Sequence, residues 1–411
     1  MKYVLTRAPV LVAILAVILS VCINFMPLSA LGQNDSDQND ASFWDQTRTG
    51  ANAFNKQQTE AWFEDASDLG VSWVRLAFDK WESKHRDFLV GDADNYQGLV
   101  EEDFAKLEKV LDWADEHNLK VVLSPLTLPG ARYRQNNGFK YDSRLWRDPA
   151  FADQANRYWF DLVTQLKNHP AVAAYNIINE PAPELGTGLA EHDVPGNVER
   201  FMPWYETHKN TPADLYAFYS GIIKTIRSVD PKTMIMVDAG WYAQPTAFTY
   251  WPGPLPDHNI LYAFHMYEPF DFTSNGNFKN KKNFVYPGIV PFAGKDVNWN
   301  RDKIRAYLAP FYKWTEQHKI APNRLVAAEF GCMRRNKGCA QYLGDVIDVF
   351  DENDTHWAFY SFREDEWDGY DYEVGTGGLP WDYWKAVDRG EKPEVPRSDT
   401  DIFLTIKSKL K

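Results

Sequence analysis

Residues 171–181, with the sequence AVAAYNIINEP, decide the fold class of this chain. A mostly apolar run, interrupted only by Asn176, leads into Asn179-Glu180-Pro181. Such a run is typical of a strand buried on both faces of a parallel sheet. The sequence therefore predicts a strand that presents an amide and a carboxylic acid at its carboxyl end, where parallel barrels carry their chemistry.

A second stretch has the same organisation. Residues 324–331, RLVAAEFG, form a short apolar strand that ends in Glu329, with a glycine two residues later. Two strands therefore each offer one glutamate at the same end of the predicted sheet. Two carboxyl groups that meet in one cleft suit the cleavage of a glycosidic bond, one as the proton donor and the other as the nucleophile or base.

The rest of the chain alternates strand-like segments with amphipathic helices, which predicts a parallel sheet. Polar residues concentrate after the strands, and no glycine-rich phosphate turn follows the first one. We therefore expect a single closed (β/α)8 TIM barrel with long βα loops at 182–211 and 268–300. The further strand-like segments are 49–55, 71–78, 120–124, 233–238, 260–265 and 356–361, and the helices lie near 60–69, 101–117, 149–166, 212–228, 302–317, 340–350 and 401–410.

The amino terminus has the pattern of a secretory signal peptide over residues 1–32, with a basic start, a short apolar core over 10–23 and a small-residue cleavage site. An uncleaved anchor that tethers the chain is the alternative. Residues 33–42 are polar and acidic and predict a disordered leader. The catalytic domain is expected over 43–411, in a secreted or periplasmic protein without stable membrane insertion after cleavage of the signal.

Charge and composition limit the partners of the chain. The net charge is −13, and loss of the two cations in residues 1–32, which hold no acid, leaves −15. Such a balance disfavours nucleic acid and anionic membranes as partners. The 16 tryptophans and 21 tyrosines are first of all core material, but they also suit stacking against sugars. We expect a monomer that binds a carbohydrate substrate.

Other classes of hydrolase lack support in the sequence. The nine histidines are scattered, without the short spacings of a metal site, so we expect no catalytic metal and no cofactor. No Gly-x-Ser-x-Gly motif of a serine hydrolase occurs. Export makes a disulfide between Cys332 and Cys339 plausible, with two free thiols as the alternative.

Several of these positions together resemble one known family, the family 5 glycoside hydrolases, which are cellulase-like retaining (β/α)8 barrels. The resemblance runs from about residue 49 to 410. It rests on Asn179-Glu180-Pro181 after the fourth strand and Glu329 after the seventh. It also rests on Arg75 after the second strand and on His265-Met-Tyr267 after the sixth. The order and spacing of these motifs are more specific than any one of them.

The resemblance implies a role for each matched residue. Glu180 would be the acid/base and Glu329 the nucleophile, about 5 to 5.5 Å apart as retention requires. Arg75 and Tyr267 would lie beside Glu329 and favour its charged form, so that the two carboxyl groups differ in pKa. In addition, Asn179 would bind the 2-hydroxyl of the sugar, and His265 would line the site.

The sequence also departs from the family pattern. Leu126 falls near the position where the third strand usually delivers a histidine, and Tyr360 takes the place of a tryptophan after the eighth strand. Trp241 and Trp367 are candidate stacking platforms for sugars. These differences leave two-carboxylate chemistry in place, but they leave the sugar specificity open.

The expected activity is hydrolysis of β-glycosidic bonds in a polysaccharide or oligosaccharide, by an endo-β-glucanase or a β-mannanase-like enzyme. Two alternatives remain open at this point. A transglycosylase would use the same residues and pass the glycosyl group to a sugar hydroxyl. A non-catalytic sugar-binding barrel would keep the cleft without turnover.

Overall fold

The computed structural model describes residues 41–411, except 186, 188, 190–197 and 392. The predicted signal peptide and most of the predicted leader lie outside the described residues. The last two leader positions, Ala41 and Ser42, begin a 3-10 helix, η1 (Ala41–Asp45).

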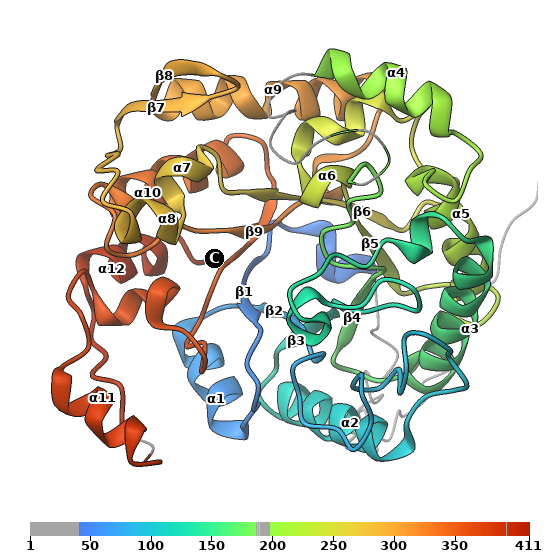
Figure 1. The fold of residues 1–411 in the computed structure, drawn as a ribbon, viewed down its shortest axis with the longest axis horizontal. Helices are drawn as coiled ribbons and strands as arrows, with labels where there is room; N and C mark the ends of the chain where they lie inside the picture. The colour runs from blue at the N-terminus through green and yellow to red at the C-terminus, as the bar shows by residue number, and fades with distance from the viewer. Residues whose placement is uncertain (1–40, 186, 188, 190–197, 392) are drawn as a thin grey trace, which may run out of the picture. The chain divides into compact units, whose positions relative to one another are not determined.

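Eight parallel strands close into a barrel in the order β1-β10-β9-β6-β5-β4-β3-β2, which confirms the predicted (β/α)8 fold (Figure 1). Every neighbouring pair is parallel, so all carboxyl ends meet at one end of the barrel. The strands are β1 (Thr49–Ala53), β2 (Trp73–Leu76), β3 (Lys120–Leu123), β4 (Val172–Asn176), β5 (Met234–Asp238), β6 (Ile260–Met266), β9 (Leu325–Phe330) and β10 (His356–Phe359).

The helices begin and end where local chemistry satisfies their backbone. Thr59 accepts a hydrogen bond from the first turn of α1, and Gly70 closes that helix in the left-handed conformation. Asp148 caps α3 ahead of Pro149, the predicted first residue of this helix. The predicted helix near 212–228 begins three residues later than expected, at Leu215, because the capping side chain is Asp214. The long helices are α1 (Glu60–Leu69), α2 (Glu101–Glu116), α3 (Pro149–Leu166), α5 (Leu215–Arg227), α9 (Arg301–Gln317) and α10 (Cys339–Asp351), and the chain ends with α11 (Trp381–Asp388) and α12 (Asp401–Lys407).

The hydrophobic core has two layers. A large cluster fills the space between the strands and the surrounding helices, and a second cluster fills the interior of the barrel. Trp44 and Trp73, both fully buried, belong to the inner cluster, and the indole of Trp44 donates to the carbonyl oxygen of Ala173 at 3.2 Å. The barrel is thus a packed core, and any site must lie at one of its ends.

The two long segments predicted as loops contain short elements. The first includes α4 (Val198–His208), and the second includes α7 (Phe270–Thr273), α8 (Asn275–Lys279) and an antiparallel hairpin of β7 (Gly288–Phe292) and β8 (Lys295–Trp299) (Figure 1). The loop after β5 carries α6 (Gly240–Ala243) and η4 (Pro245–Tyr250). These segments enlarge the loop end of the barrel around its carboxyl-terminal opening.

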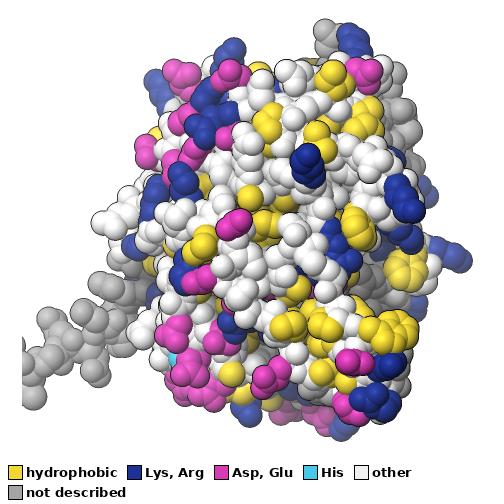
Figure 2. All heavy atoms as spheres, turned by 90° about the vertical axis from the view of Figure 1, so that its left-hand side faces the viewer, with side chains coloured by type: hydrophobic (Ala, Val, Ile, Leu, Met, Phe, Trp, Pro, Cys, Tyr) yellow, Lys and Arg dark blue, Asp and Glu magenta, His cyan; other side chains and the backbone are white. Residues whose placement is uncertain are grey.

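The surface combines charged side chains of both signs with scattered apolar ones. Figure 2 shows hydrophobic side chains gathered low on the face that carries α11. Trp381 and Trp384 of that helix are exposed. Within the described part of the chain, none of the helices combines the length and the apolar character needed to cross a bilayer.

Candidate active site

The matched residues lie together at the carboxyl ends of four strands. Arg75 belongs to β2, His265 to β6 and Glu329 to β9. Glu180 follows β4 by four residues, and Tyr267 directly follows β6. Parallel strands place these ends around one opening, so residues far apart in sequence form one cluster.

Glu329 is buried and held by two donors. Its Oε1 accepts a hydrogen bond from Nη1 of Arg75 at 2.6 Å, and its Oε2 accepts one from the hydroxyl of Tyr267 at 2.9 Å. The side chain of Arg75 is fully buried, so the ion pair is little screened by water. Both oxygens are therefore fixed in position and face stabilising donors.

Glu180 has a different environment. Its side chain is 32% exposed, and its Oε1 lies 2.8 Å from Nδ1 of His265. One oxygen each of Glu180 and Glu329, with a ring nitrogen of His265, lie within 4.8 Å of one another. The two carboxyl groups predicted from separate strands thus lie in one cluster of side chains, Glu329 buried and Glu180 partly exposed to solvent.

The backbone of Glu180 is in the left-handed region, with a φ of 47°. A non-glycine residue adopts this conformation at a cost of roughly 1–3 kcal/mol, and only where its surroundings hold it there. Its N–H donates to Oδ2 of Asp238 at 3.0 Å. The carboxylate of Asp238 therefore fixes the backbone that carries Glu180.

Asp238 and Asn176 are site residues that the sequence analysis did not identify. Fully buried Asp238 ends β5 and accepts hydrogen bonds from Arg75 Nη2 at 3.2 Å and from Asn176 Nδ2 at 3.1 Å. In turn, Oδ1 of Asn176 accepts from Nη2 of Arg75 at 2.7 Å. The available signals were the polar interruption of an apolar run at Asn176 and an acid at the end of a predicted strand at Asp238.

Asn179 is tied into the same network. Its Oδ1 accepts from Nη2 of Arg75 at 2.8 Å. Because Arg75 occupies the amide oxygen, the amide nitrogen is the part of Asn179 suited to donate to a ligand. The predicted contact with a sugar hydroxyl is chemically consistent with this orientation.

The pKa of Glu329 is set by burial and by the charged and polar groups around it. Burial raises the pKa above its ordinary value of 4.5, and the nearby Glu180 acts in the same direction. His265, Arg75 and Tyr267 oppose this rise without cancelling it. Arg75 and Tyr267 thus favour the charged form of Glu329, as predicted, but enclosure of the carboxyl group outweighs these donors, so the net shift of the pKa is upward.

His265 is a second group whose charge depends on its neighbours. Burial lowers the pKa of its ring, but Glu329, Asp238 and Glu180 raise it by more, so the net shift is upward from 6.5. Its Nδ1 lies 2.8 Å from Oε1 of Glu180, and its Nε2 lies 3.6 Å from Oδ2 of Asp238. The surrounding carboxylates therefore favour the protonated form of this ring.

One nitrogen and two carboxylate oxygens are also a donor set that a divalent cation accepts. Both oxygens of Glu329 already accept hydrogen bonds from Arg75 and Tyr267. A cation beside the buried guanidinium of Arg75 would meet direct repulsion. The arrangement fits paired acid/base groups better than metal ligands.

Comparison with known proteins agrees with this geometry. The family model described as cellulase (glycosyl hydrolase family 5) matches residues 35–366. The chain belongs to glycosyl hydrolase family 5. It is therefore a glycoside hydrolase, and its (β/α)8 barrel is the scaffold of this family.

Individual relatives of this family 5 chain are distant. Endoglucanase C of Acetivibrio thermocellus is 22% identical over 336 residues, which cover 76% of this chain and 86% of the relative. A β-xylosidase of Phanerodontia chrysosporium is 23% identical over 357 residues, 84% of this chain and 61% of the relative. The solved structure of an endoglucanase from Thermotoga maritima superposes with a TM-score of 0.58 at 16% identity, over 90% of this chain and 99% of that one. The structural likeness supports the fold.

Two departures from the family pattern, Leu126 and Tyr360, lie in or beside one small apolar cluster. Leu126 is buried and packs in a small cluster with Phe54 and Ala77. Tyr360 contacts this cluster, and its ring meets that of Phe54 edge-on at 5.5 Å. Its hydroxyl donates to Glu364 at 2.8 Å. Tyr360 is therefore half-buried beside an apolar cluster, with its hydroxyl held by Glu364.

The two predicted tryptophan platforms differ in position. Trp367 is half-buried and packs edge-on against Tyr370 at 5.0 Å, so part of its surface stays accessible. Trp241 is only 3% exposed and packs against Phe201. The prediction of Trp241 as a stacking platform is wrong, because its ring points into the core of the loop and offers no free face.

The segment after β9 is closed by a disulfide between Cys332 and Cys339, whose Cα atoms lie 5.9 Å apart. Within this loop, Arg334 is fully buried, donates to the carbonyl oxygen of Asp368 at 2.7 Å and also pairs with its carboxylate. The loop that follows the β9 glutamate is thereby connected to the loop that carries Trp367.

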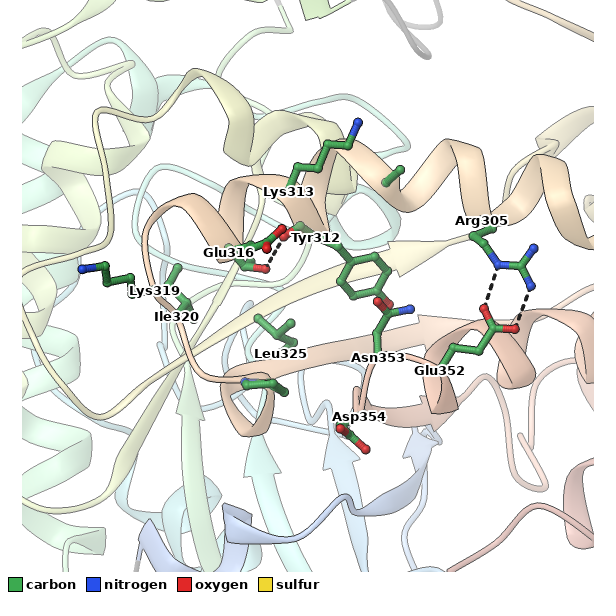
Figure 3. A pocket seen from close by; sticks show the side chains of 13 residues that line it. Arg305, Tyr312, Lys313, Glu316, Lys319, Ile320, Leu325, Glu352, Asn353 and Asp354 are labelled. Carbon is green, nitrogen blue, oxygen red and sulfur yellow. Dashed lines mark hydrogen bonds and ion pairs between the residues drawn. The ribbon is translucent and has the colours of Figure 1, made fainter.

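A pocket of about 710 Å³ lies at the opposite end of the barrel (Figure 3). It is lined by α9 from Arg305 to Glu316, by the segment from Lys319 to Leu325 that leads into β9, and by residues 352–354 between α10 and β10. Arg305 and Glu352 at its rim form a two-bonded ion pair. Because it contains neither Glu180 nor Glu329, its size does not make it the active site.

We expect Asp238→Asn to lower kcat/KM by about 100-fold, mainly through kcat. Both oxygens of Asp238 accept hydrogen bonds, and an amide would turn a donor toward Asn176 or toward the N–H of Glu180. Steady-state kinetics with an aryl β-glycoside would measure the loss. Asp230→Asn is the matched control, because this buried acid precedes β5 and binds Tyr175 at the other end of the barrel. A kcat of Asp238→Asn equal to that of the control would contradict the role of Asp238.

Proposed function

We propose that this family 5 enzyme hydrolyses β-linked glucans with retention of configuration. Glu180 acts as the acid/base and Glu329 as the nucleophile. The observation that carries the proposal is the approach of their carboxylate oxygens to within 4.8 Å. Retaining glycosidases hold these groups about 5–5.5 Å apart, whereas inverting enzymes leave about 6.5–9.5 Å for a water molecule.

In the first step, an oxygen of Glu329 attacks the anomeric carbon while Glu180 transfers its proton to the departing glycosidic oxygen. The C–O bond to the leaving group breaks, and a glycosyl ester forms on Glu329. In the second step, Glu180 accepts a proton from water as the water oxygen attacks the same carbon. Glu329 is released as a carboxylate, and Glu180 is protonated again.

The donors around each acid support this division of roles. Arg75 and Tyr267 bind the charge that Glu329 carries before attack and regains on release. Glu180 is partly exposed, so it can reach both the glycosidic oxygen and, later, a water molecule. His265 orients Glu180 through its 2.8 Å contact, and Asn179 is placed to bind the sugar 2-hydroxyl.

The choice of a β-glucan is supported by the relatives, whose names include an endoglucanase and a β-xylosidase. Glucans and xylans share an all-equatorial β-1,4-linked ring and differ at the C5 substituent. We propose a β-1,4-glucan as the first substrate to examine.

The stereochemistry of the product tests the mechanism. We expect proton NMR of cello-oligosaccharide hydrolysis to show the β-anomer first, with the α-anomer appearing only by mutarotation. A panel of glucan, mannan and xylan under the same conditions would identify the sugar. Initial release of the α-anomer would refute the retaining assignment. Transfer to an added sugar acceptor in place of water would indicate the transglycosylase alternative.

A further inference from the structure

We propose that Asp79 is a positioning residue for the reaction, which holds Asn179 and Glu180 in place through one peptide group of the loop after β3. This inference rests on the proposed role of Glu180 as the acid. It assigns a function to a buried acid that the proposed mechanism does not use. Asp79 acts through the backbone and takes no part in proton transfer or nucleophilic attack.

The first observation is the pair of hydrogen bonds that Asp79 accepts. The residue follows β2 by three positions and is only 3% exposed. Its Oδ2 accepts from the N–H of Leu126 at 2.8 Å, and its Oδ1 accepts from the N–H of Thr127 at 2.7 Å. Both donors belong to the loop after β3, which is the neighbour of β2 in the barrel. The carboxylate therefore fastens the start of this loop to the end of the adjacent strand.

The second observation is that one peptide group connects Asp79 with Asn179. The peptide bond between Pro125 and Leu126 is trans. Its N–H donates to Asp79, and its carbonyl oxygen accepts a hydrogen bond from the N–H of Asn179 at 3.0 Å. A trans peptide group is planar and stiff, so its N–H and C=O point in opposite directions. A rotation of this plane away from Asp79 would therefore also weaken the hydrogen bond to Asn179.

Asn179 transmits this constraint to the acid, because it is bonded directly to Glu180. The N–H of Asn179 is held by the carbonyl oxygen of Pro125. The next N–H, that of Glu180, is held by Asp238. Glu180 has a left-handed backbone, a conformation that persists only where its surroundings hold it. Two successive N–H groups are thus fixed from the strands on both sides of β4.

A later part of the same loop is anchored at the same point. The side-chain amide of Asn136 donates to the carbonyl oxygen of Asp79 at 3.2 Å. The N–H of Tyr133 donates to the hydroxyl of Thr127 at 3.1 Å. Asp79 and Thr127 therefore join the start of the loop to the turn around residues 133–136, so a change at Asp79 acts on the loop as a unit.

The environment of Asp79 is unfavourable for a carboxylate. Burial raises the pKa of its carboxyl group to about 7, although the N–H groups of Leu126 and Thr127 oppose this rise. A buried acid with a raised pKa beside a catalytic cluster is a candidate functional group. A purely structural anchor of the loop would have the same contacts, and kinetics with two leaving groups separate the two roles.

Two substrates with the same glycone show whether the acid is misplaced. Phenyl β-cellobioside needs a proton from Glu180 as its bond breaks, whereas dinitrophenyl β-cellobioside releases a stable anion that needs none. We expect Asp79→Ala to lower the ratio of kcat/KM for the phenyl substrate to that for the dinitrophenyl substrate about tenfold, because a misplaced acid slows only the first. Asp79→Asn, which keeps the shape of the side chain and one acceptor, should lower the ratio less. The fraction of folded enzyme cancels in this ratio, so a loss of stability does not change it.

Asp103→Ala is the matched control, because Asp103 is similarly buried and binds the N–H of Leu89 and the hydroxyl of Ser83 instead. This variant should keep the wild-type ratio, and Glu180→Ala should lower the ratio further than Asp79→Ala does. An unchanged ratio in Asp79→Ala beside a lowered one in Glu180→Ala would overturn the inference alone. An equal decrease in Asp103→Ala would also overturn it, because the effect would then follow the loss of any buried acid. An unchanged ratio in Glu180→Ala would instead refute the proposed role of Glu180.

Discussion

Replacement of Glu329 by glutamine is expected to lower kcat by at least about 10⁴-fold, equivalent to about 5.4 kcal/mol of transition-state stabilisation. The amide is a poor nucleophile and cannot form the glycosyl ester. It keeps the shape of the side chain and one acceptor for Arg75, so the barrel should remain folded. Kinetics with an aryl β-glycoside and circular dichroism on the same sample would measure both properties.

The wild-type pH profile is part of this prediction. Attack requires ionised Glu329, and burial raises its pKa, so activity should fall on the acid side at a pH above the ordinary 4.5 of a glutamate. In the folded protein the group binds its proton more tightly than in the unfolded chain. The free energy of unfolding therefore decreases as the pH rises through the raised pKa of Glu329, because the folded protein loses this tightly bound proton. Near-wild-type turnover in Glu329→Gln, or an acid limb of kcat/KM below pH 4.5, would contradict the assignment.

The strand ends were the most predictable part of the site. Asn179, Glu180 and Glu329 follow apolar runs, and a buried run that ends in a polar group indicates the carboxyl end of a barrel strand. Arg75 and Tyr267 were placed correctly for the same reason. Which side chains then meet depends on closure of the sheet, and the resemblance to family 5 supplied that step.

Asp238 shows why the supporting contacts were missed. Asp238 ends a predicted strand, but it supports the site by accepting a hydrogen bond from the backbone N–H of Glu180. This N–H points to Asp238 only because the backbone of Glu180 adopts the left-handed conformation. No periodicity in the sequence predicts that conformation for a glutamate. Trp241 was misplaced for a similar reason, since the left-handed turn after β5 directs its ring into the core.

The pKa of Glu329 illustrates a second limit. Its partners were correctly named, and each acts in the predicted direction. The net shift of the pKa is nevertheless upward, because burial is the largest effect on this group, and the sequence does not show how deeply the carboxyl group is enclosed. Opposing contributions of similar size can be ranked only when the enclosure of the carboxyl group is known.

Replacement of Glu180 by alanine is expected to produce a variant that azide rescues. Loss of the acid should slow cleavage of substrates with poor leaving groups by about 10²- to 10⁴-fold, while an activated aryl glycoside still forms the glycosyl ester on Glu329. Without a base, water attacks this ester slowly. Azide is already an anion and needs no base, so it should restore turnover and yield a β-glycosyl azide.

Glu329→Ala is the matched comparison for this experiment, because azide would then replace the nucleophile itself and yield the α-glycosyl azide. The two variants differ only in which of the neighbouring carboxyl groups is removed. The anomer of the azide product shows on which face of the anomeric carbon azide attacks, and so on which face the removed carboxyl group lies. Glu180 lies in the more exposed position that an external anion can enter, whereas Glu329 is enclosed by Arg75 and Tyr267. An α-azide from Glu180→Ala would reverse the two roles, and no rescue of either variant would remove the support for a glycosyl-enzyme.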